Sequence, residues 1–264
     1  MSAPESGPER PERTESFDTT QPAELDLTVG SGTVRIELVD DATSVRVVVR
    51  AGPGPWWAGR LGEVLTAVGN LQAPAPGGGA PGTDAVTATE ISFSPGRSRL
   101  VLRTPRSGGG RTWPLDVVVT APTRSRVLVR TGSASTEVIG VAAAVDASTG
   151  AGDVTLGDVA DEIQVRTGSG DVRTGHLHRG GRLRSGSGDL VVDATSGSLD
   201  LVTGSGALRI GISAGVLAEL DVSSGSGRAT STLPSATAPS GAADSIRVRG
   251  RTGSGDVVVQ AATT

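Results

Sequence analysis

The sequence predicts an all-β fold: a parallel β-solenoid of the single-stranded β-helix type, with coils of 18 residues. Three observations support this prediction. A glycine-centred motif recurs at a fixed interval, and aliphatic residues alternate with polar ones on both sides of it. In addition, glycine accounts for 39 of the 264 residues, whereas aromatic residues make up only 2%. So many glycines disfavour a helical bundle, because each one costs about 1 kcal/mol inside a helix.

The repeated motif is Thr/Ser-Gly-Ser-Gly-Asp-Val. Successive first glycines are separated by 18 residues four times, and then by 21 and 28 residues. An earlier copy begins at Gly30, and the later copies begin at Gly132, Gly150, Gly168, Gly186, Gly204, Gly225 and Gly253. A constant interval is typical of stacked coils, whereas a sandwich would space its strands unequally. Each motif is expected to form a corner, since glycine adopts the positive φ angles of tight turns.

Aliphatic residues flank each motif with a period of two. They stand mainly five and three positions before the first glycine, and four and six positions after it. This alternation predicts two short strands per unit, one on either side of the corner. In-register stacking would place equivalent residues about 4.8 Å apart. We therefore expect Val172, Leu190 and Leu208 to face the core, and Arg173 and Val191 to point outward. The last unit, at Gly253, is expected to close the stack.

The composition divides the chain into a tail and a single domain. Residues 1–22 are acidic and rich in Pro and Glu, which predicts a disordered tail. The solenoid domain is expected over residues 23–264. Its opening strands would occupy 23–130, with an insertion at 52–85, and its regular coils 127–264.

The insertion is expected to hold one short helix, from about residue 58 to residue 71. Aliphatic residues recur there at helical spacing, after the tryptophan pair Trp56 and Trp57. The rest of the opening part alternates like strands at 25–29, 33–39, 44–50, 86–93, 99–103, 115–120 and 125–130.

These features resemble a known family over about residues 17–261. The relevant segments are Phe17-Asp-Thr-Thr-Gln-Pro, Leu27-Thr-Val-Gly-Ser-Gly-Thr-Val, the Thr-Gly-Ser-Gly-Asp-Val units and the closing Arg251-Thr-Gly-Ser-Gly-Asp-Val-Val-Val. The layout resembles the bacterial putative-adhesin β-strand-repeat family, a domain of unknown function. The resemblance implies a β-solenoid without an established enzyme activity. Many members carry a membrane helix or an export signal. This chain shows neither, so a surface role is not supported and a cytoplasmic location is expected.

The corner motif contains the candidate binding face. Three residues after the first glycine stand aspartates, and just before it stand hydroxyl residues, expected to form an exposed ladder: Asp153, Asp171, Asp189, Thr149, Thr167 and Ser185. The aspartates could bind calcium, pair across the corner with arginines (Arg130, Arg166, Arg184 and Arg251), or cap amide groups of the turn. Turn capping is favoured, because calcium-binding repeats recur every nine residues and these recur every 18.

Several kinds of chemistry are disfavoured. The absence of cysteine excludes thiolate metal sites and cysteine nucleophiles. His176 and His178 would lie on one face of a strand, but no third zinc ligand is in sight. The sequence contains neither a nucleophile elbow nor a phosphate-binding loop. The net charge of −4 argues against nucleic acid, and no stretch of 18 apolar residues could span a membrane.

We therefore expect a non-catalytic binding or scaffold module, with no catalytic residue, metal or cofactor, whose partner is a protein or polysaccharide surface. One alternative is a carbohydrate-active β-helix enzyme that uses Asp153, Asp171 and Asp189 in a lateral groove. Glycoside hydrolysis needs two carboxylates about 5 to 9 Å apart, a distance that stacked aspartates satisfy by repetition alone. The other alternative is an intracellular polymer formed by end-to-end stacking of coils.

Overall fold

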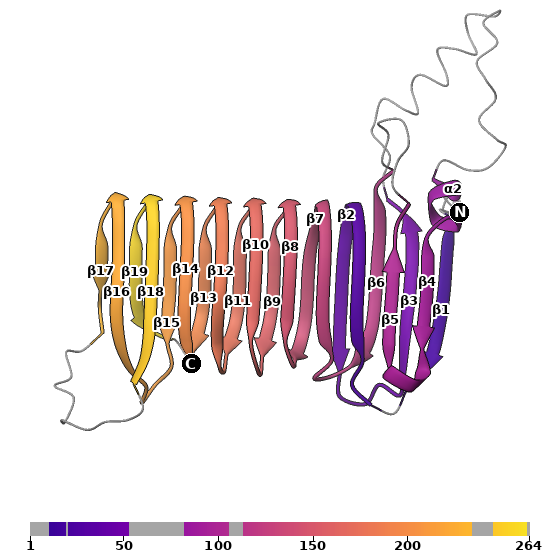
Figure 1. The fold of residues 1–264 in the computed structure, drawn as a ribbon, viewed down its shortest axis with the longest axis horizontal. Helices are drawn as coiled ribbons and strands as arrows, with labels where there is room; N and C mark the ends of the chain where they lie inside the picture. The colour runs from indigo at the N-terminus through magenta and orange to yellow at the C-terminus, as the bar shows by residue number, and fades with distance from the viewer. Residues whose placement is uncertain (1–10, 20, 53–81, 106–112, 234–244, 263–264) are drawn as a thin grey trace, which may run out of the picture.

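The computed structural model describes residues 11–19, 21–52, 82–105, 113–233 and 245–262. Its strands lie side by side along one straight axis (Figure 1), and all 19 belong to one hydrogen-bonded sheet system. The elements are β1 (Glu12–Asp18), β2 (Glu24–Val39), β3 (Ser44–Ala51), α2 (Thr83–Thr87), β4 (Glu90–Ser94), the 3-10 turn η1 (Pro95–Arg97), β5 (Arg99–Arg103), β6 (Leu115–Pro122), β7 (Arg126–Ala142), β8 (Val145–Ala151), β9 (Val154–Val159), β10 (Ile163–Ser169), β11 (Val172–Leu177), β12 (Gly180–Ser187), β13 (Leu190–Thr195), β14 (Ser198–Ser205), β15 (Leu208–Ile212), β16 (Leu217–Ser226), β17 (Ala229–Ser231), β18 (Ser245–Ser254) and β19 (Val257–Ala261).

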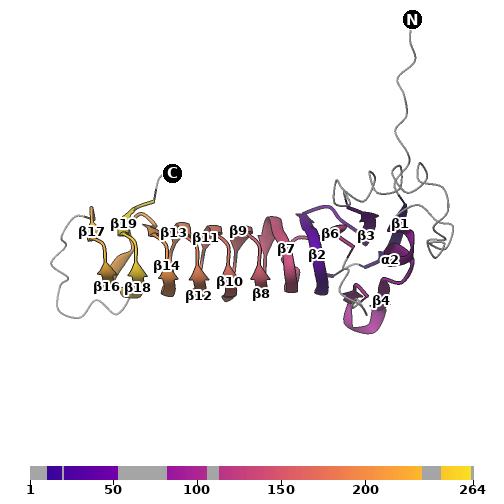
Figure 2. The ribbon, with the colours of Figure 1, turned by 90° about the horizontal axis from the view of Figure 1, so that it is seen from above.

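The middle of the chain forms regular coils of two strands each. Seen from above, β8, β10, β12 and β14 make one row, which we call the first row, and β9, β11 and β13 make the other (Figure 2). Strands within a row pair in parallel and in register, so that Thr167 lies beside Thr149 on one side and Ser185 on the other. Equivalent residues of successive 18-residue units therefore stack directly, which confirms the predicted parallel solenoid.

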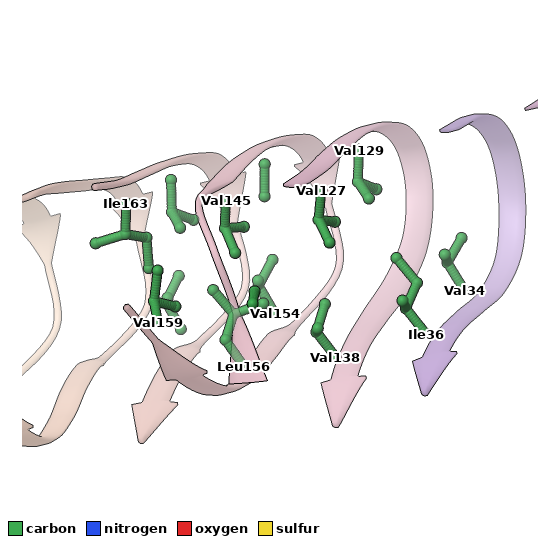
Figure 3. Close-up of a cluster of buried hydrophobic side chains, with 14 of the residues drawn as sticks. Val34, Ile36, Val127, Val129, Val138, Val145, Val154, Leu156, Val159 and Ile163 are labelled. Atoms are coloured by element: carbon green, nitrogen blue, oxygen red, sulfur yellow. The ribbon is translucent and has the colours of Figure 1, made fainter. Parts of the chain in front are cut away.

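The core is a continuous file of aliphatic side chains between the two rows. Val127, Val145 and Ile163 stack from successive coils, and Val138 and Leu156 face them from the opposite row (Figure 3). The predicted inward residues Val172, Leu190 and Leu208 pair in register and are each 0% exposed. Each coil is covered by two neighbours, so small and medium aliphatic residues are buried without any aromatic residue.

Glycine is required at the corners because the backbones of successive coils approach each other there. Gly170 has a φ of +132°, and a Cβ placed on it would lie 2.3 Å from the carbonyl oxygen of Gly152. Gly188 repeats this arrangement one coil later, with a φ of +134°. A side chain at either position would combine a strained backbone with a steric overlap.

The C-terminal end of the stack departs from chain order. Strand β18 pairs with β14 on one side and β16 on the other, and β19 likewise lies between β15 and β17 (Figure 1). The prediction that the last unit closes the stack is therefore wrong. In the internal coil, Val248, Val257 and Val259 are 0% exposed, whereas Leu220 and Val222 of the outer coil are half-exposed. The more apolar coil thus occupies the position with two neighbours.

The N-terminal end is interleaved in the same way. Strand β2 pairs in parallel with β7 on one side and with β5 and β6 on the other. Antiparallel strands then complete this end, with β3 on β6, β1 on β3 and β4 on β5. Phe17 of β1 stacks on Phe93 of β4 with ring centroids 5.0 Å apart. These contacts close the N-terminal end of the solenoid.

Two predictions for this region are wrong, and a third lies outside the described residues. Glu12–Asp18 were assigned to a disordered tail, but they form β1, in which Glu12 pairs with Arg50 at 2.7 Å. Composition suggested disorder, yet Glu12 finds a basic partner on β3, and Glu15 pairs with Arg13 within β1. The strand predicted for 86–93 begins only at Glu90, because Val86 is buried in helix α2. The helix predicted for 58–71 lies outside the described residues.

Candidate functional site

The predicted aspartates form one column at the corners, which we call the aspartate column. The backbone N–H of Asp171 donates to Asp153 Oδ1 at 2.9 Å, and that of Asp189 donates to Asp171 Oδ1 at 2.8 Å. Asp189 Oδ1 accepts in turn from the N–H of Ala207 at 2.7 Å, and Asp256 Oδ1 from that of Arg228 at 2.9 Å. Each carboxylate therefore caps the next coil, the role that the sequence favoured.

The hydrogen bonds to backbone amides also explain how like charges stack one coil apart. Each carboxylate accepts a charge-assisted hydrogen bond from a backbone N–H of the neighbouring coil. Pairing across the corner is not found within the described residues: Arg130, Arg184 and Arg251 pair with acids on neighbouring strands, and Arg166 forms no ion pair. Arg130 pairs with Asp26 at 3.6 Å, and Arg251 pairs with Asp221 at 3.4 Å. Asp153, Asp171 and Asp256 are exposed at the edge of the stack, and Asp189 is half-buried.

The hydroxyl residues of the candidate face point inward, so the expected exposed ladder is wrong. Thr149, Thr167 and Ser185 are each 7% exposed. Thr167 Oγ1 donates to the carbonyl of Ser169 at 3.1 Å, and Ser185 Oγ donates to that of Ser187 at 2.9 Å. These hydroxyls close the corner from inside. Of the six candidate residues, only the three aspartates reach the surface.

The two histidines form a small polar cluster at another corner. The rings of His176 and His178 stack with centroids 4.1 Å apart, and His176 Nε2 lies 2.9 Å from Ser196 Oγ and 3.2 Å from Ser213 Oγ. Burial, together with the nearby His178, lowers the pKa of His176 below its ordinary value of 6.5. Asp158 opposes this shift, and its Oδ1 accepts the backbone N–H of His176 at 2.9 Å.

The described part of the chain contains no group of three or more histidine, aspartate or glutamate side chains arranged to hold a metal ion. Nor does any helix in that part have the length and apolar character needed to cross a bilayer.

A second surface column lies on the first row. From the sequence, its arginines were considered only as partners of the aspartates. We call it the arginine column. The parallel register aligns its five members at the same outward position, with Thr28, Ser148 and Val202 filling the gaps between them: Arg103, Arg130, Arg166, Arg184 and Arg251. Four of these arginines stand two residues before a motif glycine, so the repeat already contained the signal.

The family of the chain follows from residues 117–264, which match the model described as Toastrack DUF4097. This chain belongs to the Toastrack DUF4097 family. The match covers more than half of the 264 residues and includes all the regular coils. The match supports the resemblance found in the sequence at the level of a family of unknown function. A search of curated proteins finds no match.

Several solved structures similar to this Toastrack chain are described as putative adhesins or a putative cell adhesion protein, and another is described as a putative lipid binding protein. A putative adhesin from Parabacteroides distasonis is 10% identical, with a TM-score of 0.45, and the alignment covers 95% of this chain and 97% of that one. A putative adhesin from Bacteroides fragilis is 12% identical, with a TM-score of 0.43, over 96% and 98% of the two chains. A putative cell adhesion protein from Clostridium sporogenes is 9% identical, with a TM-score of 0.40, over 96% and 99%. Similarity this low does not extend the names of those proteins to this chain.

Proposed function

We propose that this Toastrack chain is a non-catalytic binding module that presents columns of side chains to an extended partner. The observation behind the proposal is the parallel register of the coils, which repeats outward positions in straight lines along both rows. A partner with its own repeat could contact several coils at once, and many weak contacts then add up through multivalency. A cytoplasmic location stays a prediction from the sequence, which fractionation of the native host would test.

The equivalent hydrogen bonds of the three aspartates favour a binding role over a catalytic one. Asp153, Asp171 and Asp189 each place Oδ1 on an amide of the next coil, at 2.7–2.9 Å. A catalytic pair of carboxylates needs two different environments, so that one group is an acid and the other a base or nucleophile. Three carboxylates in equivalent environments instead suit a repeated structural role. The antiparallel strands at the N-terminal end likewise disfavour a polymer made by head-to-tail stacking of coils.

The test compares single Asp→Asn variants at positions 153, 171 and 189 with Asp146→Asn. Asp146 is an exposed control on the first row without a hydrogen bond or ion pair within the described residues. Asparagine keeps the Oδ1 acceptor, so each corner variant should change the unfolding free energy by less than about 1 kcal/mol. The parent protein should bind at least one polysaccharide of a test panel and should not hydrolyse it. Hydrolysis that one substitution abolishes and the other two leave intact would refute the proposal in favour of an enzyme.

A further inference from the structure

The arginine column places five arginines at one outward position along the described surface. From Arg103 to Arg251 it crosses seven coil steps, which corresponds to about 34 Å at the spacing of parallel strands. No acidic residue occupies any of these outward positions. The next outward column on the same row carries both positive and negative charges. Asp146 is followed two coils later by Arg182, and Arg182 is followed one coil later by Asp200.

The guanidinium groups of this column are only weakly engaged by the protein itself. The nearby acids have closer partners, since Asp200 pairs with Arg182 at 3.0 Å and with Arg184 at 3.9 Å. Asp221 likewise pairs with Arg249 at 3.1 Å and with Arg251 at 3.4 Å. Arg166 has no ion pair within the described residues.

Exposure supports the same conclusion. The side chains of Arg130, Arg184 and Arg251 are between 51% and 58% exposed. Both partners of the Arg251–Asp221 pair are about half exposed, so this pair contributes little. Arg130 and Arg184 reach more buried acids, Asp26 and Asp200, but only at the long distances of 3.6 and 3.9 Å. An external anion can therefore compete for the arginines.

Hydroxyl groups line the edge of the column. Three residues after four of the arginines, exposed serines occupy the middle of the corner: Ser133, Ser169, Ser187 and Ser254. Their Oγ atoms make no hydrogen bond within the described residues. The arginines, and the serines three residues after them, repeat along the stack and can provide both charge-assisted and neutral hydrogen bonds to anionic oxygens. A surface hollow of about 610 Å³ adjoins the N-terminal end of the column, lined in part by Thr28, Arg103 and Arg130.

We propose that the arginine column and its serines bind an extended acidic polysaccharide, lying along the first row with its carboxylate groups on successive arginines. This inference rests on the proposed function and names the partner class. Two arginines in adjacent coils, Arg166 and Arg184, form its centre. The coil step is comparable to the length of one sugar in an extended chain, so Arg166 and Arg184 can meet carboxylates on neighbouring sugars, and the other arginines, two coils apart, can meet carboxylates on alternate sugars.

One feature favours a polysaccharide over nucleic acid, and a second confines the attraction for either polyanion to the column. Proteins that bind single-stranded nucleic acid stack bases on aromatic side chains, and all five aromatic residues of this chain lie at or before Trp113. The net charge of −4 also provides no general attraction for a polyanion, so attraction is confined to the column. Short-range contacts with spaced carboxylates suit this arrangement.

The experiment measures binding of the full chain to polygalacturonate, with neutral dextran and poly(dT) as comparison polymers, by isothermal titration calorimetry at low and high salt. The test variant is Arg166→Gln/Arg184→Gln. The matched control is Arg173→Gln/Arg209→Gln, which removes the same charge from two exposed arginines on the opposite row. We expect the test variant to lose about tenfold or more in affinity, the control to stay within about twofold, and salt to weaken binding of the parent.

Three results would overturn the inference. Equal losses in both double variants would mean nonspecific charge attraction. Tighter binding to poly(dT) than to polygalacturonate would identify a nucleic-acid surface instead. Binding to dextran that neither variant changes would leave the non-catalytic binding function standing while removing the arginine column as its site.

Discussion

The interleaved C-terminal end can be tested by disulfide cross-linking, because the chain contains no cysteine of its own. Val202 of β14 lies beside Arg251 of β18, and Arg251 lies beside Ser223 of β16, all at one outward position. Neighbouring strands are about 4.8 Å apart, so Val202 and Ser223 are separated by two steps, about 9.6 Å. A disulfide requires Cα atoms within about 7 Å of each other.

Cysteine pairs at 202/251 and 251/223 should therefore oxidise within one molecule, whereas a pair at 202/223 should remain reduced. Non-reducing electrophoresis and peptide mapping of the oxidised proteins would show which bonds form. The 251/223 pair is the internal control, since these positions are adjacent in either stacking order. A stack in chain order would place β16 directly on β14. Rapid cross-linking at 202/223, with none at 202/251, would thus refute the interleaved arrangement.

Three further predictions concern the core, the corner and pH. Leu190→Asp should lower the unfolding free energy, measured by urea denaturation, by more than about 3 kcal/mol, because it buries an unpaired charge. Val191→Asp on the outer face should lower it by less than about 1 kcal/mol. Equal losses would mean that the assigned register is wrong by one residue. Gly170→Ala should cost about 1–3 kcal/mol or more, from its φ of +132° and its 2.3 Å overlap, whereas Gly96→Ala, with nothing within 4 Å, should be nearly neutral. The pKa of His176 is lowered in the folded protein, so the unfolded state takes up the proton first as the pH falls. The contribution of His176 to stability is therefore complete above about pH 6.5 and declines below it. Thermal melts from pH 7.5 to 5.5 should show a weaker decline for His176→Asn than for the parent protein, and an unchanged decline would contradict this prediction.

The repeated part of the fold was predictable because local and tertiary patterns agree there. Glycine fixed the corners, and the period-two aliphatic pattern fixed which side chains point inward. Both recur every 18 residues, so one correct assignment for a coil applies to all of them. Val172, Leu190 and Leu208 were assigned to the core on this basis, and all three are fully buried.

The candidate site was predicted only in part, and the reason is again the period of two. Thr149 stands two residues after Ala147, and Thr167 stands two after Val165, so the same alternation that buried Ala147 and Val165 also buries the hydroxyls. Treating the hydroxyl column as a surface feature ignored that parity. The arginine column was visible in the sequence, but the weakness of its own ion pairs was not, because it depends on closer pairs such as Arg182 with Asp200, which need the register of neighbouring coils.

The order of the end coils could not be read from the sequence, because every unit has the same corner and the same inward positions. Any coil could stack on any other in register, so local patterns leave the order open. Burial distinguishes the candidates only when whole coils are compared. Val257 and Val259 occupy positions that Ala229 and Ser231 hold in the outer coil, so the valine-rich coil gains more from two neighbours.

Interleaving also has a consequence for how the stack resists unravelling. In a solenoid, stability is the sum of contributions from each coil and from each interface between neighbours. A last coil at the very end of the stack would have one interface and a free chain terminus, so it would be the first part to fray. Here the coil formed by β18 and β19 lies inside, where it has interfaces with β14 and β15 on one side and with β16 and β17 on the other. The exposed outer coil is instead an internal stretch of chain joined covalently at both ends. At the opposite end β2 is likewise internal, but β3, β1 and β4 lie outside β5 and β6, and the outermost β1 is the first described strand of the chain. Interleaving therefore protects the C-terminal end of a stack whose individual coils are weak.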